Sequence, residues 1–179
     1  MDIKKILALT VLIFALFACM GAASAGLFDF FGGESTQTYT FDGFTLDIPE
    51  SADVSYENLS GIVPYQDGNE IKEGYLDCNL YTVHMENGET IYVSSAEGAG
   101  AVSSIDEYIA NMERAGVIAE GTYGEWTIIN TNDAPLSMGN GMKVTQEYIL
   151  VKFSGGKIIT IYGNDLDQLK NIADSYKEV

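Results

Sequence analysis

The sequence predicts an α+β domain, in which a mostly antiparallel sheet of about six strands has two amphipathic helices packed on it. The turn dipeptides Asp42-Gly43 and Asn87-Gly88 are each flanked by alternating apolar and polar residues, which is typical of β-hairpins. Two other segments, after Ser104 and after Asp165, repeat apolar residues at helical spacing. Strands joined by hairpins are antiparallel, and the two helices are expected to cover the sheet.

The domain is expected to begin near Tyr39 with the first hairpin. Residues 39–41 and 44–48 alternate around the turn, and Pro49 ends the second strand because proline has no N–H to donate. Residues 51–78 contain many Gly, Pro, Asn and Asp residues. This composition predicts a long loop that contains one or two short strands.

The second hairpin joins Leu80–Met85 to Thr90–Val93. A helix is predicted to follow, because Ser104 and Glu107 form a capping box at its start and Gly116 is suited to its end. The apolar stripe of this helix, which is expected to pack on the sheet, consists of Ile105, Tyr108, Ile109 and Met112.

Three strands and a second helix are expected to complete the domain. Residues 125–131, 142–153 and 157–162 are predicted strands, and Ser154-Gly155-Gly156 joins the last two. Asp165 is suited to cap the closing helix. The apolar face of that helix consists of Leu166, Leu169, Ile172, Ala173 and Tyr176.

The N-terminus has the pattern of an export signal. Lys4 and Lys5 precede an apolar run that starts at Ile6 and ends in the small-residue tripeptide Ala23-Ser24-Ala25. A positive start, an apolar middle and a small-residue exit are the three parts of a secretory signal peptide. We therefore expect cleavage after Ala25, with Ala23 and Ala25 as the residues that the peptidase recognises.

Two other interpretations of residues 1–25 stay open. The apolar run reaches about 18 residues, the lower limit for a membrane-spanning helix, so the segment is also suited to remain as an uncleaved anchor. Leu16-Phe17-Ala18-Cys19 approximates a lipobox, in which Cys19 is lipidated. All three routes export the domain and predict an extracellular or cell-surface location. Membrane contact is expected only through residues 1–25, when they are uncleaved or lipidated.

A leader, residues 26–38, is predicted between the signal and the single domain, residues 39–179. Its first part, Gly26–Gly33, sets four large apolar residues between glycines, and a polar stretch follows. This composition is typical of a flexible leader. The alternative is an aromatic plug that lies at a membrane interface or docks in a groove.

The charge of the chain excludes nucleic acid as a partner. The formal net charge is −17, and the removal of residues 1–25, which contain Asp2, Lys4 and Lys5, changes it to −18. Phosphates and anionic membranes are repelled by such a chain. The charge favours solubility, or alternatively the attraction of cations.

Two single residues, Cys78 and Asn58, are candidates for a free thiol and for glycosylation. Cys78 is the only cysteine after cleavage, which excludes an internal disulfide, and its position between Leu76 and Leu80 indicates a small buried residue. Asn58 begins the only N-glycosylation sequon, Asn58-Leu59-Ser60, and is a candidate for modification in an archaeal or eukaryotic host.

No group of residues predicts catalysis or a cofactor. The single histidine, His84, alternates with strand residues and is expected at the surface rather than as a general base. The densest oxygen runs, Asn130–Asp133 and Asn164–Asp167, lack the spacing of an EF-hand calcium loop. We assign no catalytic, cofactor-binding or metal-ligating residue.

The function predicted from these features is that of an exported, non-catalytic binding or accessory module, with an envelope protein or a glycan as partner. One alternative is a membrane-tethered accessory subunit of an envelope complex, held by residues 1–25. A second is a small secreted hydrolase that uses paired carboxylates. The tyrosines expected to supply the recognition surface are Tyr81, Tyr92, Tyr108, Tyr123 and Tyr148.

The stretch Tyr39–Pro49, with its hairpin that ends in a proline, resembles the opening of Mog1/PsbP-like domains. The resemblance implies further strands, a helix, more strands and a closing helix over Asp165–Val179, in an accessory or binding module. The leader, with Ala23-Ser24-Ala25 followed by Gly26–Gly33, is similar to those of small exported proteins of methanogenic archaea.

Overall fold

The computed structural model describes residues 35–67, 70–99, 101–114, 117–131, 136–137 and 143–179. Two helices, α2 (Ile105–Arg114) and α3 (Leu166–Asp174), are among its elements. The strands are β1 (Thr36–Thr40), β2 (Phe44–Pro49), β3 (Asp53–Asn58), β4 (Gly61–Asp67), β5 (Glu70–His84), β6 (Thr90–Glu97), β7 (Ile118–Tyr123), β8 (Trp126–Asn130), β9 (Leu136–Ser137), β10 (Lys143–Val144), β11 (Tyr148–Ser154), β12 (Lys157–Gly163) and β13 (Lys177–Glu178).

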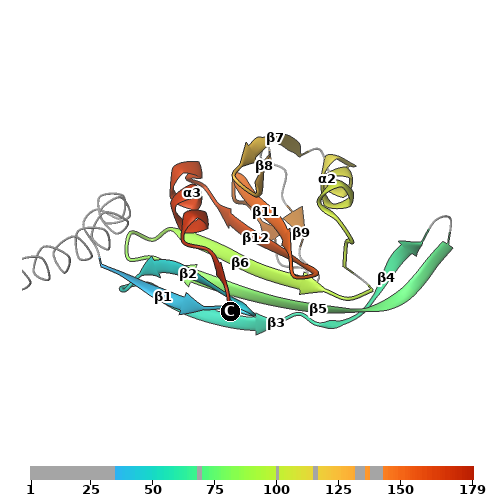
Figure 1. The fold of residues 1–179 in the computed structure, drawn as a ribbon, viewed down its shortest axis with the longest axis horizontal. Helices are drawn as coiled ribbons and strands as arrows, with labels where there is room; N and C mark the ends of the chain where they lie inside the picture. The colour runs from blue at the N-terminus through green and yellow to red at the C-terminus, as the bar shows by residue number, and fades with distance from the viewer. Residues whose placement is uncertain (1–34, 68–69, 100, 115–116, 132–135, 138–142) are drawn as a thin grey trace, which may run out of the picture.

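The main sheet confirms the predicted α+β class but is larger than expected. It has eight strands in the order β3-β5-β6-β12-β11-β8-β7, with β4 paired to β5 beside this path, and every pairing is antiparallel. The expectation of about six strands was therefore wrong. A separate sheet of three strands has the order β1-β2-β13. Figure 1 shows β4 and the adjoining part of β5 extending beyond the rest of the main sheet.

The three predicted hairpins are confirmed. Asp42-Gly43 joins β1 to β2, Asn87-Gly88 lies between β5 and β6, and Gly155-Gly156 joins β11 to β12. The glycines at these turns have φ between +59° and +86°, in the left-handed region that side chains disfavour.

Several elements differ from the expectation. The first strand begins at Thr36 rather than Tyr39, and the strand predicted over 142–153 is found as two strands, β10 and β11. Residues 51–78 form β3, β4 and the start of β5 rather than a long loop. Strand β7 was not predicted, because its exposed residues do not alternate and a bulge interrupts its pairing between Ala119 and Gly121. The closing helix stops at Asp174 instead of reaching Val179, since the last residues pair with β2 as β13.

The end of α3 is fixed by Ser175. Its hydroxyl donates to the carbonyl of Ile172 at 2.6 Å and accepts the N–H of Asp47 in β2 at 2.7 Å. The start of α3 is capped as predicted, because Asp165 accepts the N–H groups of the residues at the second and third helical positions. The chain therefore leaves α3 already hydrogen-bonded to the smaller sheet.

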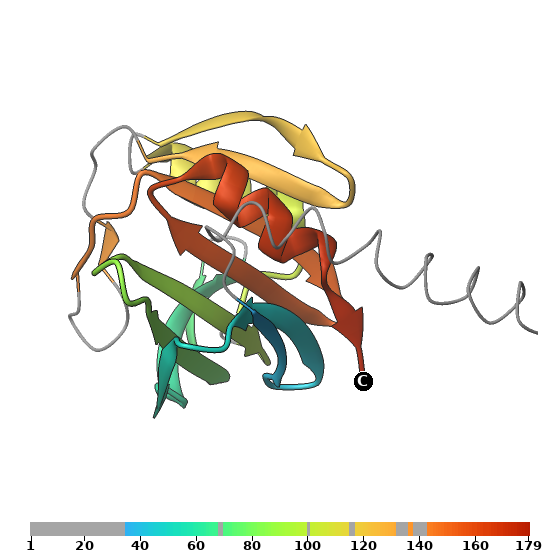
Figure 2. The ribbon, with the colours of Figure 1, turned by 90° about the vertical axis from the view of Figure 1, so that its left-hand side faces the viewer.

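The larger core lies between the main sheet and a layer made of α3 and the β1-β2-β13 sheet. Phe44, Leu46 and Ile48 of β2 are fully buried against this face, as is Leu169 of α3. Figure 2 shows α3 in front of the strands with the β1–β2 hairpin below it. The core side chains of the sheet itself include Val83, Ile91, Val93, Trp126, Leu150, Ile159 and Ile161.

The opposite face of the sheet is covered by α2. Tyr108 is buried there with side chains of β8, β11 and β12, and Ile105 and Met112 pack at the margin of the cluster. Ser104 accepts the N–H of Glu107 at 3.2 Å, which confirms half of the capping box. The Glu107 carboxylate accepts instead from the N–H of Ser103 at 2.7 Å, one residue earlier than the capping-box pattern requires.

One carboxylate fastens the first hairpin to three neighbouring strands of the main sheet. Oδ2 of Asp42 accepts from Nζ of Lys157 on β12 at 2.7 Å, Oγ of Ser95 on β6 at 2.9 Å and Nδ2 of Asn79 on β5 at 3.1 Å. Nζ of Lys157 also lies 3.2 Å from Oε1 of Glu97. The two sheets are therefore joined by charged hydrogen bonds as well as by the apolar core.

The same contacts shift two pKa values in opposite directions. Burial by itself would raise the pKa of Asp42, but hydrogen bonds from Lys157, Ser95 and Asn79 and the charge of Lys157 outweigh it and lower that pKa. Burial by itself would lower the pKa of Lys157, but the hydrogen bonds to Asp42 and Glu97 and their charges raise it. Both shifts favour the charged pair in the folded state.

The Leu169→Ala substitution is expected to lower the free energy of unfolding by about 2–5 kcal/mol, because it leaves a cavity in the larger core. Ile109→Ala is the matched control: this side chain is only half-buried on α2, so its loss is expected to be smaller. Chemical denaturation of both variants measures the difference. Equal losses would contradict the packing of α3 described above.

The Asp42→Asn substitution is expected to destabilise the fold by about 1–3 kcal/mol at neutral pH, since three donors lose a charged acceptor. The pKa of Asp42 is lowered, so its contribution is complete above the ordinary value of 3.8 and is lost as pH falls below it. The raised pKa of Lys157 makes its contribution complete below 10.5 and lost as pH rises further.

The measurement is urea denaturation at neutral pH and at about pH 2–3, where the carboxylate protonates. The gap between wild type and Asp42→Asn is expected to narrow at the acid pH. The exposed carboxylate of Asp53, substituted to Asn, serves as the control and is expected to leave stability nearly unchanged. A gap that is the same at both pH values would show that the charge of Asp42 is not what stabilises the hairpin.

Candidate functional site

The residues predicted to direct export lie outside the described part of the chain. This applies to Ala23 and Ala25, to Cys19, and to the apolar leader residues 27–31. Within the described ranges, neither helix has the length and apolar character that crossing a bilayer requires. Cleavage, anchoring and lipidation therefore stay predictions.

Cys78 lies on β5 and is half-buried. Burial, and secondarily the negative charge of Asp77, raise the pKa of its thiol. Its N–H donates to Oγ of Ser60 at 2.9 Å. A raised pKa keeps the sulfur protonated near neutral pH, so Cys78 is a poor nucleophile.

Asn58, the sequon residue, is exposed at the end of β3 but is part of a hydrogen-bond network. Its Nδ2 donates to Oδ1 of Asn79 at 3.0 Å, and its Oδ1 accepts the N–H of Ser60 at 3.1 Å. The hydroxyl of Tyr56 donates to the same Oδ1 of Asn79 at 2.8 Å. Asn79 in turn donates to Asp42, so the network reaches the contact between the two sheets.

His84 lies exposed at the end of β5, with Nδ1 3.3 Å from Oγ1 of Thr90. In the described ranges, no three side chains among the Asp, Glu, His and Cys residues are grouped so that they could hold a metal ion. The oxygen run at 164–167 serves the backbone, because Asn164 accepts the N–H of Glu147 and Asp165 caps α3. Part of the run at 130–133 lies outside the described residues.

The tyrosines expected to form a recognition surface are mostly packed in the fold. Tyr108, which belongs to α2, is buried between this helix and the main sheet. Tyr81 lies edge-on against Phe41 in the larger core. The tyrosines with the most exposed side chains are instead Tyr56 and Tyr75. Both belong to the segment that the sequence did not resolve into strands.

The most exposed apolar surface lies on a two-stranded ribbon formed by β4 and residues 70–76 of β5. The two strands pair from Gly61 with Leu76 to Asp67 with Glu70. Residues two apart on a strand share a face, so Ile71, Glu73 and Tyr75 lie on one side of the ribbon. Their cross-strand partners, which include Ile62 opposite Tyr75, lie on the same side.

That side of the ribbon, here called the apolar ribbon face, consists of Ile62, Pro64, Ile71, Glu73 and Tyr75. Ile71 is 81% exposed, Ile62 is 72% exposed and Tyr75 is 58% exposed. Large apolar side chains gathered at this exposure are uncommon on a monomer and indicate an interaction site.

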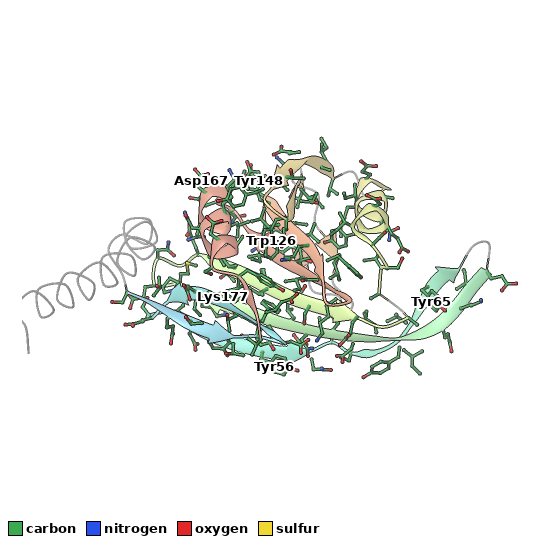
Figure 3. All side chains as sticks on the ribbon, viewed as in Figure 1. Tyr56, Tyr65, Trp126, Tyr148, Asp167 and Lys177 are labelled. Carbon is green, nitrogen blue, oxygen red and sulfur yellow. The ribbon has the colours of Figure 1, made fainter. Side chains whose placement is uncertain are left out.

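The opposite side of the ribbon is partly covered near its root, at Gly74, whereas Lys72 farther along the ribbon is exposed. A Cβ atom added at Gly74 would lie 2.8 Å from Cε1 of Tyr65 and 3.0 Å from Cβ of Ala99, so the tyrosine ring lies directly over this glycine. A Cβ atom added at Gly98, whose φ is +103°, would lie 2.5 Å from the carbonyl oxygen of Tyr75, so only glycine fits there. Figure 3 shows Tyr65 on this ribbon, well away from Trp126 beside α3. These contacts fix the ribbon at its root and leave the apolar ribbon face uncovered.

The sequence signal for this ribbon is its turn. Residues 68–69, Gly-Asn, are a dipeptide typical of two-residue hairpin turns. The flanking residues 61–67 and 70–76 do not alternate regularly between apolar and polar, so the many Gly, Pro and Asp residues of 51–78 favoured a loop instead.

In comparisons with known proteins, no family model matches the chain, and no curated protein or solved structure is significantly similar to it.

Proposed function

We propose that this chain is an exported, non-catalytic binding module that holds a protein partner on the apolar ribbon face. The observation that supports the proposal most is the exposure of Ile62, Ile71 and Tyr75, three large apolar side chains on one side of the ribbon. Burial of such a side chain in a complex contributes about 1.5–3 kcal/mol.

The antiparallel pairing makes the ribbon a suitable surface for a partner. Among the described strands, β4 pairs with β5 alone, so its second edge offers backbone N–H and C=O groups beside the apolar side chains. A partner strand can add to this edge while its side chains contact Ile62 and Pro64. Apolar contacts and main-chain hydrogen bonds are thereby combined.

Charge indicates the chemistry of the partner. The chain has a net charge of −17, and the apolar ribbon face itself includes Glu73. The negative charge at this surface repels a second copy of the chain and an anionic membrane. We therefore propose a protein partner whose apolar contact residues are surrounded by Lys and Arg side chains.

The alternative of a membrane-tethered accessory subunit uses the same surface. It differs in whether residues 1–25 remain attached, and fractionation of native cells into membrane and soluble material distinguishes the two. The hydrolase alternative has less support, because the described residues offer no histidine or metal group positioned to assist a pair of carboxylates.

A photo-crosslinking residue in place of Ile71 is expected to capture one protein in an envelope fraction of the source cells. The same residue at Ile118 is the matched control, because that isoleucine is 55% exposed on β7, the opposite edge strand of the main sheet. Once the captured protein is purified, Ile62→Ser and Ile71→Ser are each expected to weaken binding about tenfold or more. Ile118→Ser is expected to leave the affinity unchanged.

Exposed substitutions of this kind are expected to leave the melting temperature nearly unchanged, so lost binding cannot be attributed to unfolding. Three results would contradict the proposal. They are crosslinks from position 71 to a second copy of the chain, crosslinks to lipid alone, and equal affinity of the Ile62→Ser/Ile71→Ser double variant for the captured protein.

A further inference from the structure

A pocket lies beside the end of α3, on the opposite side of the fold from the apolar ribbon face. Its volume of about 400 Å³ falls within the range of about 300–1,000 Å³ that is usual for small-molecule sites. We call it the Lys152 pocket. It is lined by Tyr123, Gly124, Glu125, Trp126, Lys152, Ala173, Asp174 and Tyr176.

The pocket contains a buried positive charge. Lys152 on β11 is only 5% exposed, and its Nζ lies 3.9 Å from the ring centre of Tyr176 and 5.5 Å from that of Trp126. Oε2 of Glu125, at the turn between β7 and β8, accepts from this Nζ at 2.9 Å. A buried ammonium held by two rings and one carboxylate is a fixed polar group of the kind that orients a ligand.

Two carboxylates lie at the rim. Glu125 uses one oxygen for Lys152, and Asp174 uses Oδ2 to accept the hydroxyl of Tyr123 at 2.7 Å. The second oxygen of each carboxylate remains as an acceptor for a ligand hydroxyl. The hydrogen bond from Tyr123 also fixes its half-buried ring at the wall, where it offers an apolar surface.

These features together favour a neutral ligand with several hydroxyl groups. An anion is repelled by Glu125, Asp174 and the negative charge of the whole chain, while Nζ of Lys152 is already engaged by Glu125 and two aromatic rings. Hydroxyl groups donate to the carboxylates at no such cost, and the C–H face of a sugar ring buries its apolar surface on tyrosine. We propose that the Lys152 pocket is a binding site for a neutral carbohydrate.

The pocket is suited to binding rather than to cleavage. Glycoside hydrolysis needs a carboxylic acid that keeps its proton near neutral pH. The hydrogen bond from Lys152, and then its charge, lower the pKa of Glu125, so this side chain is ionised. An ionised carboxylate accepts hydrogen bonds from sugar hydroxyls and does not protonate a leaving group.

The test is an NMR titration of the chain with the methyl glycosides of glucose, galactose and mannose, followed through the backbone amides. Concentrations up to about 10 mM detect a Kd of about 1 mM. At least one neutral sugar is expected to shift the amides of Gly124, Glu125 and Asp174. Glucosamine and glucuronate are the charged probes, and glucuronate is expected to bind more weakly than the neutral sugar because the site and the chain repel anions.

Asp174→Asn is expected to weaken the binding of that sugar about tenfold or more, since a charged acceptor is lost. Asp53→Asn is the matched control: Asp53 is an exposed carboxylate on β3 that does not line the pocket, so its substitution is expected to have no effect. Tyr123→Ala is a second variant, which removes the ring surface and is expected to abolish the amide shifts.

Three results would overturn the proposal: no amide shift at the pocket with any neutral sugar, tighter binding of either charged probe, or equal effects of Asp174→Asn and Asp53→Asn. The Ile71→Ser variant is expected to bind the sugar as the wild type does. Sugar binding and the protein contact on the ribbon can therefore fail separately.

Discussion

The rest of the structure depends on one constraint, which is that the two sheets must pack their apolar faces against each other. A three-stranded sheet with two short outer strands has too little core to be stable alone, so β2 must bury Phe44, Leu46 and Ile48 against the main sheet. The main sheet, in turn, would expose an apolar face without that layer. Asp42 sets the position of the contact, because its carboxylate is bonded to three adjacent strands at once.

Both proposed binding surfaces lie where this cover ends. At one end, β5 extends beyond the layer made of α3 and the β1-β2-β13 sheet. Its residues 70–76 pair there with β4, and the apolar ribbon face is left uncovered. At the other end, α3 stops at Asp174 so that the chain can return to β2, and the gap beside this stop is the Lys152 pocket. The same packing that stabilises the core thus leaves both proposed surfaces accessible.

Local sequence signals predicted the elements that form through neighbouring residues. The hairpins at Asp42-Gly43 and Asn87-Gly88 and the caps of both helices depend on turn and capping chemistry, which a short stretch specifies. Strand β13 could not be predicted, because residues 177–178 form a strand only through pairing with β2, far away in the chain. Neither could the pocket, since Lys152 meets Tyr176 and Glu125 only after three separate segments come together. The number of strands was underestimated because residues 51–78 contain many Gly, Asn and Asp residues and lack a regular alternation of apolar and polar residues.

Hydrogen exchange of the free chain, resolved to single amides, tests the account most directly. Amides of β2, β6 and β12 are expected to exchange only through global unfolding, because both their pairing and their cover are complete. Amides of residues 71–75 are expected to exchange faster, although their ladder with β4 is continuous, because one side of the ribbon is uncovered. Ribbon amides that exchange as slowly as those of β12, or β2 amides that exchange fast, would contradict this account. In the account, the packing of α3 and the smaller sheet stabilises the core and does not extend over the ribbon.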